Sequence, residues 1–189
     1  MKAISSNKCI SAALVSLALL ASSDAWAETF FMKLTGKLQG DIEGDVVQRG
    51  KEGSIQVLTM THEIVSLRDA ASGLPTGKRQ HKPIVVRIPV DKSFPKLYQA
   101  LVTNESLSSV EIKSFDAPSG RSGAAAQKHA WTLTLTNASI AGISSLTQAG
   151  AKPNDKDQLL EVSFTYQKIE WTWVNGGITA TDDWEAVAN

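Results

Sequence analysis

Apolar and polar residues alternate along much of the chain with a period of two, the pattern of a β-strand with one buried face. In residues 110–115, Val110 and Ile112 share one face while Glu111 and Lys113 share the other. Similar alternating or β-branched runs occupy residues 30–34, 54–60, 84–90, 131–136 and 159–174. This pattern predicts a mainly β protein.

The longest alternating run, residues 159–174, contains an irregularity. Phe164 and Tyr166 share one face, whereas the next apolar residues, Ile169 and Trp171, lie on the other. Side chains on one face of a strand are separated by even numbers of residues, so the odd step from Tyr166 to Ile169 breaks the alternation. It predicts either a β-bulge or a strand that passes from one sheet into another contact.

One segment has the period of a helix. Asp91 or Ser93 can cap its first turn, and Pro95 is tolerated there because the first N–H groups of a helix have no intrahelical partner. Its apolar residues recur every three or four positions and so form one stripe. They are Phe94, Leu97, Tyr98, Leu101 and Val102. The pattern predicts a short helix that ends near Asn104.

One short helix among roughly eight strands indicates a particular architecture. We expect a β-barrel of two packed sheets, closed or nearly closed, with one flanking α-helix. Residues 66–83 and 116–128 are rich in Gly, Pro and polar residues and are predicted loops. A loop as long as residues 66–83 is uncommon inside a compact domain and is usually either functional or disordered.

Residues 1–27 have the pattern of a secretory signal peptide. A weakly basic start precedes an apolar run over residues 10–21, and Ala25 and Ala27 occupy the small-residue positions of a cleavage site. The apolar run is shorter than the roughly 20 residues that a membrane-spanning helix needs. We expect cleavage after Ala27 and a secreted protein, with transit through the periplasm, whose single domain is residues 28–189.

Two other interpretations of this first segment remain open. It resembles an amphipathic anchor in length, and the true translation start can lie downstream, for example at Met32. Cys9 is the only cysteine of the chain. The domain that follows the predicted cleavage site therefore holds together without a disulfide.

Charge and hydropathy exclude several classes of partner. The chain has 19 Lys and Arg against 19 Asp and Glu, so no basic surplus draws it to nucleic acid. The basic cluster at residues 78–82 lacks interleaved aromatic residues. No second apolar run reaches membrane-spanning length, so we expect no membrane span in the mature chain.

No motif indicates a cofactor, a metal or a catalytic site. His62, His81 and His129 lack the spacing of metal ligands, and no cysteine after the cleavage site completes a zinc site. The acidic residues 41–52 lack the central glycine and flanking helices of a calcium loop. An enzyme that uses His62 or His81 with a carboxylate is the least favoured hypothesis, because no nucleophile motif accompanies them.

Three tryptophans are candidates for partner contacts. Trp171 and Trp173 lie on one face of the long predicted strand, and Trp184 lies close to the chain end. Tryptophan is enriched where apolar surface meets a partner, and chain ends fray unless they dock. We predict that these residues serve assembly or tail docking, with ordinary core packing as the alternative.

A set of short segments occurs in an order and spacing that are specific in combination. They are GKLQGDI at 36–42, SGLPTGKRQHKP at 72–83, SFPKLYQAL at 93–101, VEI at 110–112, YQKIEW at 166–171 and TDDWEA at 181–186. In these segments, which span nearly all of residues 29–189, the chain resembles the Hcp family. Its members are the haemolysin-coregulated proteins of the bacterial type VI secretion system.

The resemblance implies an Hcp-like β-barrel that assembles into a hexameric ring. In this family, rings stack into a hollow tube that is surrounded by sheath proteins. The tube is fired together with a VgrG-type spike protein. Small effector proteins travel in its lumen. The family's extended loop, which crosses ring–ring contacts, matches residues 66–83. By this resemblance Lys78, Arg79, His81 and Lys82 are candidates for the ring-stacking contacts.

The predicted signal peptide departs from the family pattern, because typical members leave the cell through the contractile machine. Two functions of different classes therefore stay open. The first is a structural tube subunit that carries effectors. The alternative is an independently exported β-barrel binding module, or effector carrier, that does not build the tube.

Overall fold

The computed structural model describes residues 28–116, 127–146 and 158–185. The predicted signal peptide and part of the loop at residues 116–128 lie outside the described residues.

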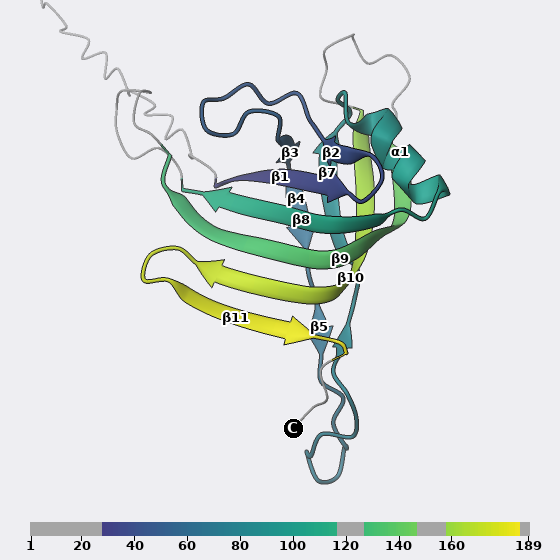
Figure 1. The fold of residues 1–189 in the computed structure, drawn as a ribbon. Helices are drawn as coiled ribbons and strands as arrows, with labels where there is room; N and C mark the ends of the chain where they lie inside the picture. The colour runs from purple at the N-terminus through teal and green to yellow at the C-terminus, as the bar shows by residue number, and fades with distance from the viewer. Residues whose placement is uncertain (1–27, 117–126, 147–157, 186–189) are drawn as a thin grey trace, which may run out of the picture.

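The described residues form strands and one helix, with the N-terminal strand beginning directly after Glu28. The elements are β1 (Thr29–Gly36), β2 (Gly40–Ile42), β3 (Ile55–Val57), β4 (Thr59–Thr61), β5 (Ile64–Val65), β6 (Gln80–His81), β7 (Ile84–Pro89), α1 (Phe94–Val102), β8 (Ser106–Phe115), β9 (His129–Leu146), β10 (Leu159–Trp173) and β11 (Ile178–Asp183). The prediction of a mainly β fold with one flanking helix is confirmed (Figure 1).

All strands except β5 and β6 form one strongly curved antiparallel sheet, whose main order is β2-β1-β8-β9-β10-β7-β4, with β11 paired to β10. β3 pairs with β1, while β4, which follows β3 after the single residue Leu58, pairs with β7. The segment 55–61 therefore connects β7 to β1, two strands that are far apart in the order of the sheet. Pairing can thus be followed from β1 through the sheet to β7 and back to β1. This closure gives the sheet the inside and outside of a barrel (Figure 1).

The long strand β10 has two different neighbours along its length. Residues Leu159 to Phe164 pair with β7, whereas Lys168 to Trp173 pair with β11. Strand β10 therefore changes its neighbour along its length, as the second interpretation of the broken alternation expects, but it does so within one sheet and does not leave it.

The change of inward-facing side occurs where Gln167 lies beside Asn137 of β9. Tyr166 and Ile169 are both buried although they are an odd number of residues apart. Asn137 has a φ of 53°, and its side-chain amide donates to the side-chain oxygen Oε1 of Gln167 at 2.8 Å. The one bulge between β9 and β10 lies elsewhere, between Ser163 and Phe164, so the predicted bulge near Gln167 is wrong.

The interior is a single cluster of buried aliphatic and aromatic side chains drawn from β1, the segment 55–61, β7, α1, β8, β9 and β10. Its largest fully buried members are Phe164, Met32, Ile42, Ile55, Ile84, Ile88, Leu97, Leu107, Ile112, Leu133, Leu135 and Leu160. Each such side chain contributes roughly 1.5–3 kcal/mol when fully buried. The core therefore holds the barrel together without a disulfide.

Helix α1 has the predicted bounds and packs on the side of the barrel through Leu97 and Ala100. Ser93 makes no side-chain cap, which differs from one of the two expectations. Asp91 instead accepts a hydrogen bond from the Ser93 N–H at 2.9 Å. Asn104, with a φ of 49°, ends the helix as its short polar side chain allows.

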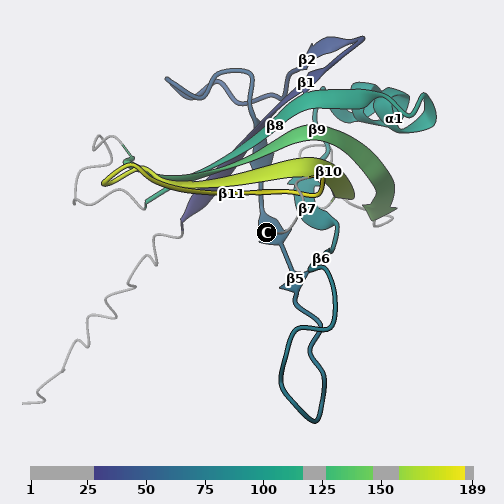
Figure 2. The same ribbon diagram turned by 60° about the horizontal axis from the view of Figure 1, so that its bottom comes forward.

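Residues 64–81 form a narrow arm that leaves the barrel beyond β4 (Figures 1 and 2). β5 and β6 pair at its base, and a bridge between Arg68 and Pro75 holds the strands together further out. The tip is a turn in which the Asp69 carboxylate accepts from the N–H groups of Ala71 and Ser72. Most of the predicted loop at residues 66–83 is therefore an ordered hairpin.

Glu105 anchors the β1–β2 turn from the end of the helix. Its buried carboxylate accepts the N–H groups of Leu38 and Gln39 at 2.7 and 2.9 Å, and the Gln39 amide at 2.7 Å. Burial alone would raise the pKa of Glu105, but these hydrogen bonds outweigh it and lower the pKa. A Cβ atom at Gly36 would collide with the carboxylate, so this position requires glycine.

Gly36→Ala is expected to destabilise the fold by roughly 2–4 kcal/mol, because the new methyl group displaces a buried carboxylate from three donors. Urea unfolding followed by tryptophan fluorescence measures the loss. Gly77→Ala is the matched control, since a Cβ atom there meets nothing within 4 Å. Equal stability of the two variants would contradict the anchoring role of Glu105.

Candidate functional site: the base of the arm

The base of the arm is tied to the C-terminal strand by a cluster of side chains from distant parts of the chain. Arg79 and His81 come from the second side of the arm, His62 from the link between β4 and β5, Tyr166 from β10 and Asp182 from β11. We call this cluster, His62, Arg79, His81, Tyr166 and Asp182, the arm latch. Antiparallel pairing of β10 and β11 places Asp182 opposite Ile169.

Hydrogen bonds link the members of the arm latch into a continuous chain. His81 Nε2 lies 2.8 Å from Asp182 Oδ2, and His81 Nδ1 lies 2.8 Å from the Tyr166 hydroxyl. The same hydroxyl lies 3.1 Å from His62 Nε2. The Tyr166 oxygen therefore bridges two imidazole rings.

Arg79 completes the latch from the solvent side. Its guanidinium makes a two-pronged ion pair with the Asp182 carboxylate and donates to the backbone carbonyl of Asp183 at 3.3 Å. Such planar, bidentate pairing fixes geometry as well as charge. The Arg79 side chain is 35% exposed and that of Asp182 only 16%, so solvent screens the pair incompletely.

Burial controls the ionisation of the latch. It lowers the pKa of His62. For His81, burial and then the positive charges of Arg79 and His62 lower the pKa. Burial raises the pKa of Tyr166 to about 12, so its phenol keeps its proton and has one hydrogen to donate. Both histidines are therefore neutral at pH 7.

Two of the three predicted tryptophans lie beside the latch. The Trp184 ring is 4.9 Å from the His81 ring, and the Trp171 ring is 5.8 Å from the His62 ring. Trp173 lies away from them at the far end of β10, where it is 51% exposed. The structure thus separates Trp173 from the other two.

The predicted loop residues also divide into two groups. Arg79 and His81 bind Asp182 within the same protomer. Lys78 and Lys82 have exposed side chains, and the backbone N–H of Lys82 donates to the Glu63 carbonyl at 3.0 Å. The described part of the chain holds no ion pair to either lysine.

Sequence reasoning missed Tyr166 and Asp182 as site residues, and it treated His62 only as a possible catalytic group. Tyr166 has the signature of an ordinary inward-facing strand residue. Asp182 lies in the segment 181–186, which carried part of the family resemblance, so this segment was the available signal for it. Their meeting depends on how β10 and β11 pair with the arm base, which local pattern does not reveal.

The latch has the chemistry of a structural tie. His81, with a side chain 3% exposed, uses both ring nitrogens in hydrogen bonds. The recess beside it, lined by Lys78, Arg79, His81 and Trp184, has a volume of about 10 Å³. That is close to the smallest volume that admits one water molecule.

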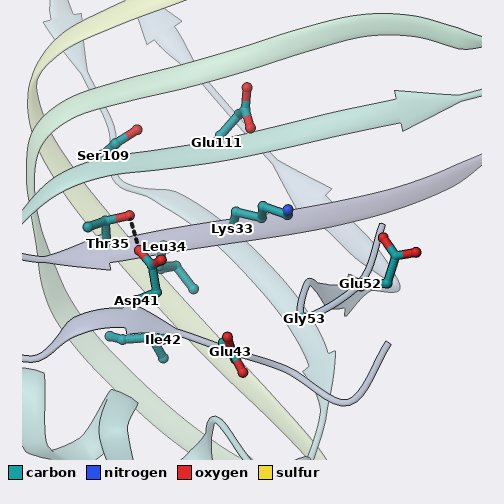
Figure 3. Close-up of a pocket in the computed structure, with 10 residues that line it drawn as sticks. All are labelled: Lys33, Leu34, Thr35, Asp41, Ile42, Glu43, Glu52, Gly53, Ser109 and Glu111. Atoms are coloured by element: carbon teal, nitrogen blue, oxygen red, sulfur yellow. Dashed lines mark hydrogen bonds between the residues drawn. The ribbon is translucent and has the colours of Figure 1, made fainter. Parts of the chain in front are cut away.

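A larger recess lies on the outer side of β1 and has a volume of about 290 Å³ (Figure 3). Lys33 points into it from β1, while Glu43, Glu52 and Glu111 surround it. Thr35 donates to Asp41 at its rim at 2.8 Å. Within the described ranges, no group of three or more His, Cys, Asp or Glu side chains is placed to hold a metal ion.

In residues 28–116, 127–146 and 158–185, no helix is long and apolar enough to cross a membrane.

A barrel with one lateral helix and a projecting arm is an architecture that this structure shares with solved Hcp proteins. The family model that matches residues 31–173 is described as "Type VI secretion system effector, Hcp". The chain belongs to this Hcp family, which confirms the resemblance found in the sequence. The match begins in β1 and ends with β10, so it includes the arm and most of the latch.

Individual relatives support the same assignment. The chain is 35% identical over 167 residues to the "Major exported protein" of Pseudomonas aeruginosa. This match covers 82% of the chain and 95% of that protein. It is similar to Hcp1 of the E. coli EAEC 042 pathovar, with 28% identity, a TM-score of 0.72 and coverage of 84% and 99%. It is also similar to the secreted protein Hcp3 of Pseudomonas aeruginosa, with 30% identity and a TM-score of 0.65. That match covers 85% of this chain and 100% of Hcp3.

Tyr166→Phe is expected to destabilise the protein by roughly 1–3 kcal/mol, because both histidines lose a buried hydrogen-bond partner. Thermal unfolding measures the loss. Tyr98→Phe, on the partly exposed face of α1, is the matched control and is expected to stay near the parent stability. If both variants unfold alike, the phenol does not hold the latch together.

Proposed function

We propose that this chain is a ring-forming tube subunit of a type VI secretion system, that its rings stack, and that it has no catalytic activity. Its family membership supports the system, and the projecting arm is the observation that carries the assembly role. Leu74 at the arm tip is 65% exposed and Leu67 is 42% exposed. An arm held rigidly at its base presents these apolar side chains to a neighbouring subunit.

The two ends of the barrel support a head-to-tail arrangement. Trp173 and Ile178 face each other across β10 and β11 at one end and are 51% and 68% exposed. Leu38 and Val102 lie near Glu105 at the other end and are 82% and 69% exposed. A ring pairs two different patches of one protomer, so apolar residues at opposite ends fit such an interface.

The predicted loop residues take different roles in this proposal. Lys78 and Lys82 are exposed and contact the next ring directly. Arg79 and His81 act through the position of the arm, because their side chains are engaged with Asp182. Trp184 docks the tail on the arm base through His81.

The remaining partners follow from the family alone. A hollow tube requires sheath proteins around it, a VgrG-type spike at its end and small effector proteins inside it. Export is supported by the name of the Pseudomonas aeruginosa relative, "Major exported protein". Rings that form but never stack would favour the alternative, an exported binding module or effector carrier.

Leu74→Glu is expected to raise the concentration needed for assembly at least about tenfold. Burial of a leucine is worth roughly 1.5–3 kcal/mol and each 1.4 kcal/mol is a factor of about ten. Light scattering over a dilution series, with electron microscopy of the same samples, measures rings and tubes. Thermal unfolding is the control and is expected to be unchanged, because the side chain has no role in the protomer core. A parent protein that stays monomeric at all concentrations would contradict the proposal.

The secreted protein is expected to begin at Glu28. This residue directly precedes β1, and its carboxylate accepts from the Trp131 indole N–H at 3.1 Å, so cleavage after Ala27 leaves the whole sheet intact. N-terminal sequencing of protein recovered from the medium tests the site. Comparison of strains with and without a working sheath shows which route exports it. An N-terminus at Met1 or Met32 would contradict the signal peptide.

A further inference from the structure

The hydrogen bonds of the arm latch have a defined direction when both histidines are neutral. The Asp182 carboxylate only accepts, so His81 Nε2 carries the hydrogen of the 2.8 Å contact. His81 Nδ1 then accepts from the Tyr166 hydroxyl, which in turn accepts from His62 Nε2. Every contact has one donor and one acceptor, from His62 through Tyr166 and His81 to Asp182.

This series of hydrogen bonds accommodates one added proton when two of its members exchange the roles of donor and acceptor. A proton on His81 Nδ1 turns that nitrogen into a donor toward the Tyr166 oxygen. The Tyr166 hydroxyl then rotates and donates to His62 Nε2, provided that His62 carries its own hydrogen on Nδ1. The contacts at 2.8 and 3.1 Å keep their partners.

A second proton leaves the latch unsatisfied. When His62 is also charged, His62 Nε2 and His81 Nδ1 both donate to the Tyr166 oxygen, and the Tyr166 hydroxyl has neither ring left as an acceptor. Its pKa near 12 prevents it from losing that hydrogen instead. A buried hydroxyl without its partner is costly, and so are two cationic rings on one oxygen.

The surrounding charges oppose the second proton as well. Lys78 and Arg79 flank His81 on the arm, and β11 contributes Asp182 and Asp183. Asp182 is already paired with Arg79, and Asp183 lies beside Lys168 in the register of β10 and β11. With both histidines charged, the latch holds three cations around the single carboxylate of Asp182.

We propose that the arm latch is a two-proton switch, which holds the arm against β11 at neutral pH and releases it in mildly acidic surroundings. In the released arm His81 is exposed, and His62 no longer shares the Tyr166 oxygen with it, so the pKa values of both rise toward the ordinary value of about 6.5. The closed state has the lower pKa values, so release takes up protons. The closed arm is therefore fully stable above about pH 6.5 and loses stability as the pH falls below that value.

The consequence for assembly rests on the proposed function. If the arms join neighbouring subunits, stacked rings loosen in acid because their arms are no longer held in one orientation. The switch itself is a property of a single protomer and is tested without any ring.

Hydrogen–deuterium exchange of the exported protein between pH 7.5 and pH 5 measures release. Protection factors of the β5 and β6 amides, corrected for intrinsic exchange, report the arm, including the Lys82 N–H that bonds Glu63. Amides of β8 and β9 report the barrel in the same sample. Because the closed latch already holds one proton without loss of contacts, protection of the arm is expected to fall with a slope of about one proton per molecule, roughly tenfold per pH unit. The barrel amides keep their protection.

His62→Gln is the decisive variant. Glutamine reaches a similar position, bonds Tyr166 as donor or acceptor, and does not titrate. A charged His81 then keeps all its partners, so the slope is expected to fall toward zero. His129→Gln is the matched control, because His129 bonds Trp131 and Thr132 outside the latch, and it is expected to keep the parent slope. A parent slope near zero, or an unchanged slope in His62→Gln, would overturn the switch. Absence of rings at every pH would overturn the proposed function and leave this result standing.

Discussion

Closure of the sheet by the segment 55–61 is the constraint on which the rest of this structure depends. This one stretch pairs with β1 through β3 and with β7 through β4, so it joins strands that are far apart in the order of the sheet. It thereby seals the buried cluster around Phe164 and Leu135. The arm begins three residues after this stretch, at Ile64, so its starting point is fixed by the same pairing that closes the barrel.

The arm and the C-terminal strand depend on each other. β11 pairs only with β10 among the described strands, and most of it is exposed. The ion pair from Arg79 and the hydrogen bond from His81 tie Asp182 of β11 to the arm base. A projecting element that must meet a neighbour loses less entropy on binding when it is already oriented. By fixing the orientation of the arm within a protomer, the latch therefore favours the assembly that the family membership suggests.

Patterns along the sequence predicted β1, the segment 55–61, β7, β8, the first part of β9, β10 and the helix bounds, because each depends on which face of a short segment is buried. The short strands β2, β5 and β6 and the C-terminal strand β11 were not predicted. The bulge between β9 and β10 lies between Ser163 and Phe164 and not at the odd step near Gln167, where the neighbouring residue Asn137 has a φ of 53°. Arg79, His81 and Trp184 were predicted as contact residues for ring stacking and tail docking, but not as partners of one another. Tyr166 was missed because an inward-facing tyrosine in a strand looks like any other core residue.

The amino-acid sequence by itself determined the β-rich class, the single helix, the leader-like first segment and the family, because these depend on local periodicity and on motifs in order. Only the tertiary structure decided that the long polar loop is a latched hairpin and that His62, His81 and Asp182 share one hydrogen-bonded chain. These groups are up to 120 residues apart, from His62 to Asp182, and are brought together by strand pairing across the barrel. Local propensity carries no information about such contacts, since they exist only after the core has folded.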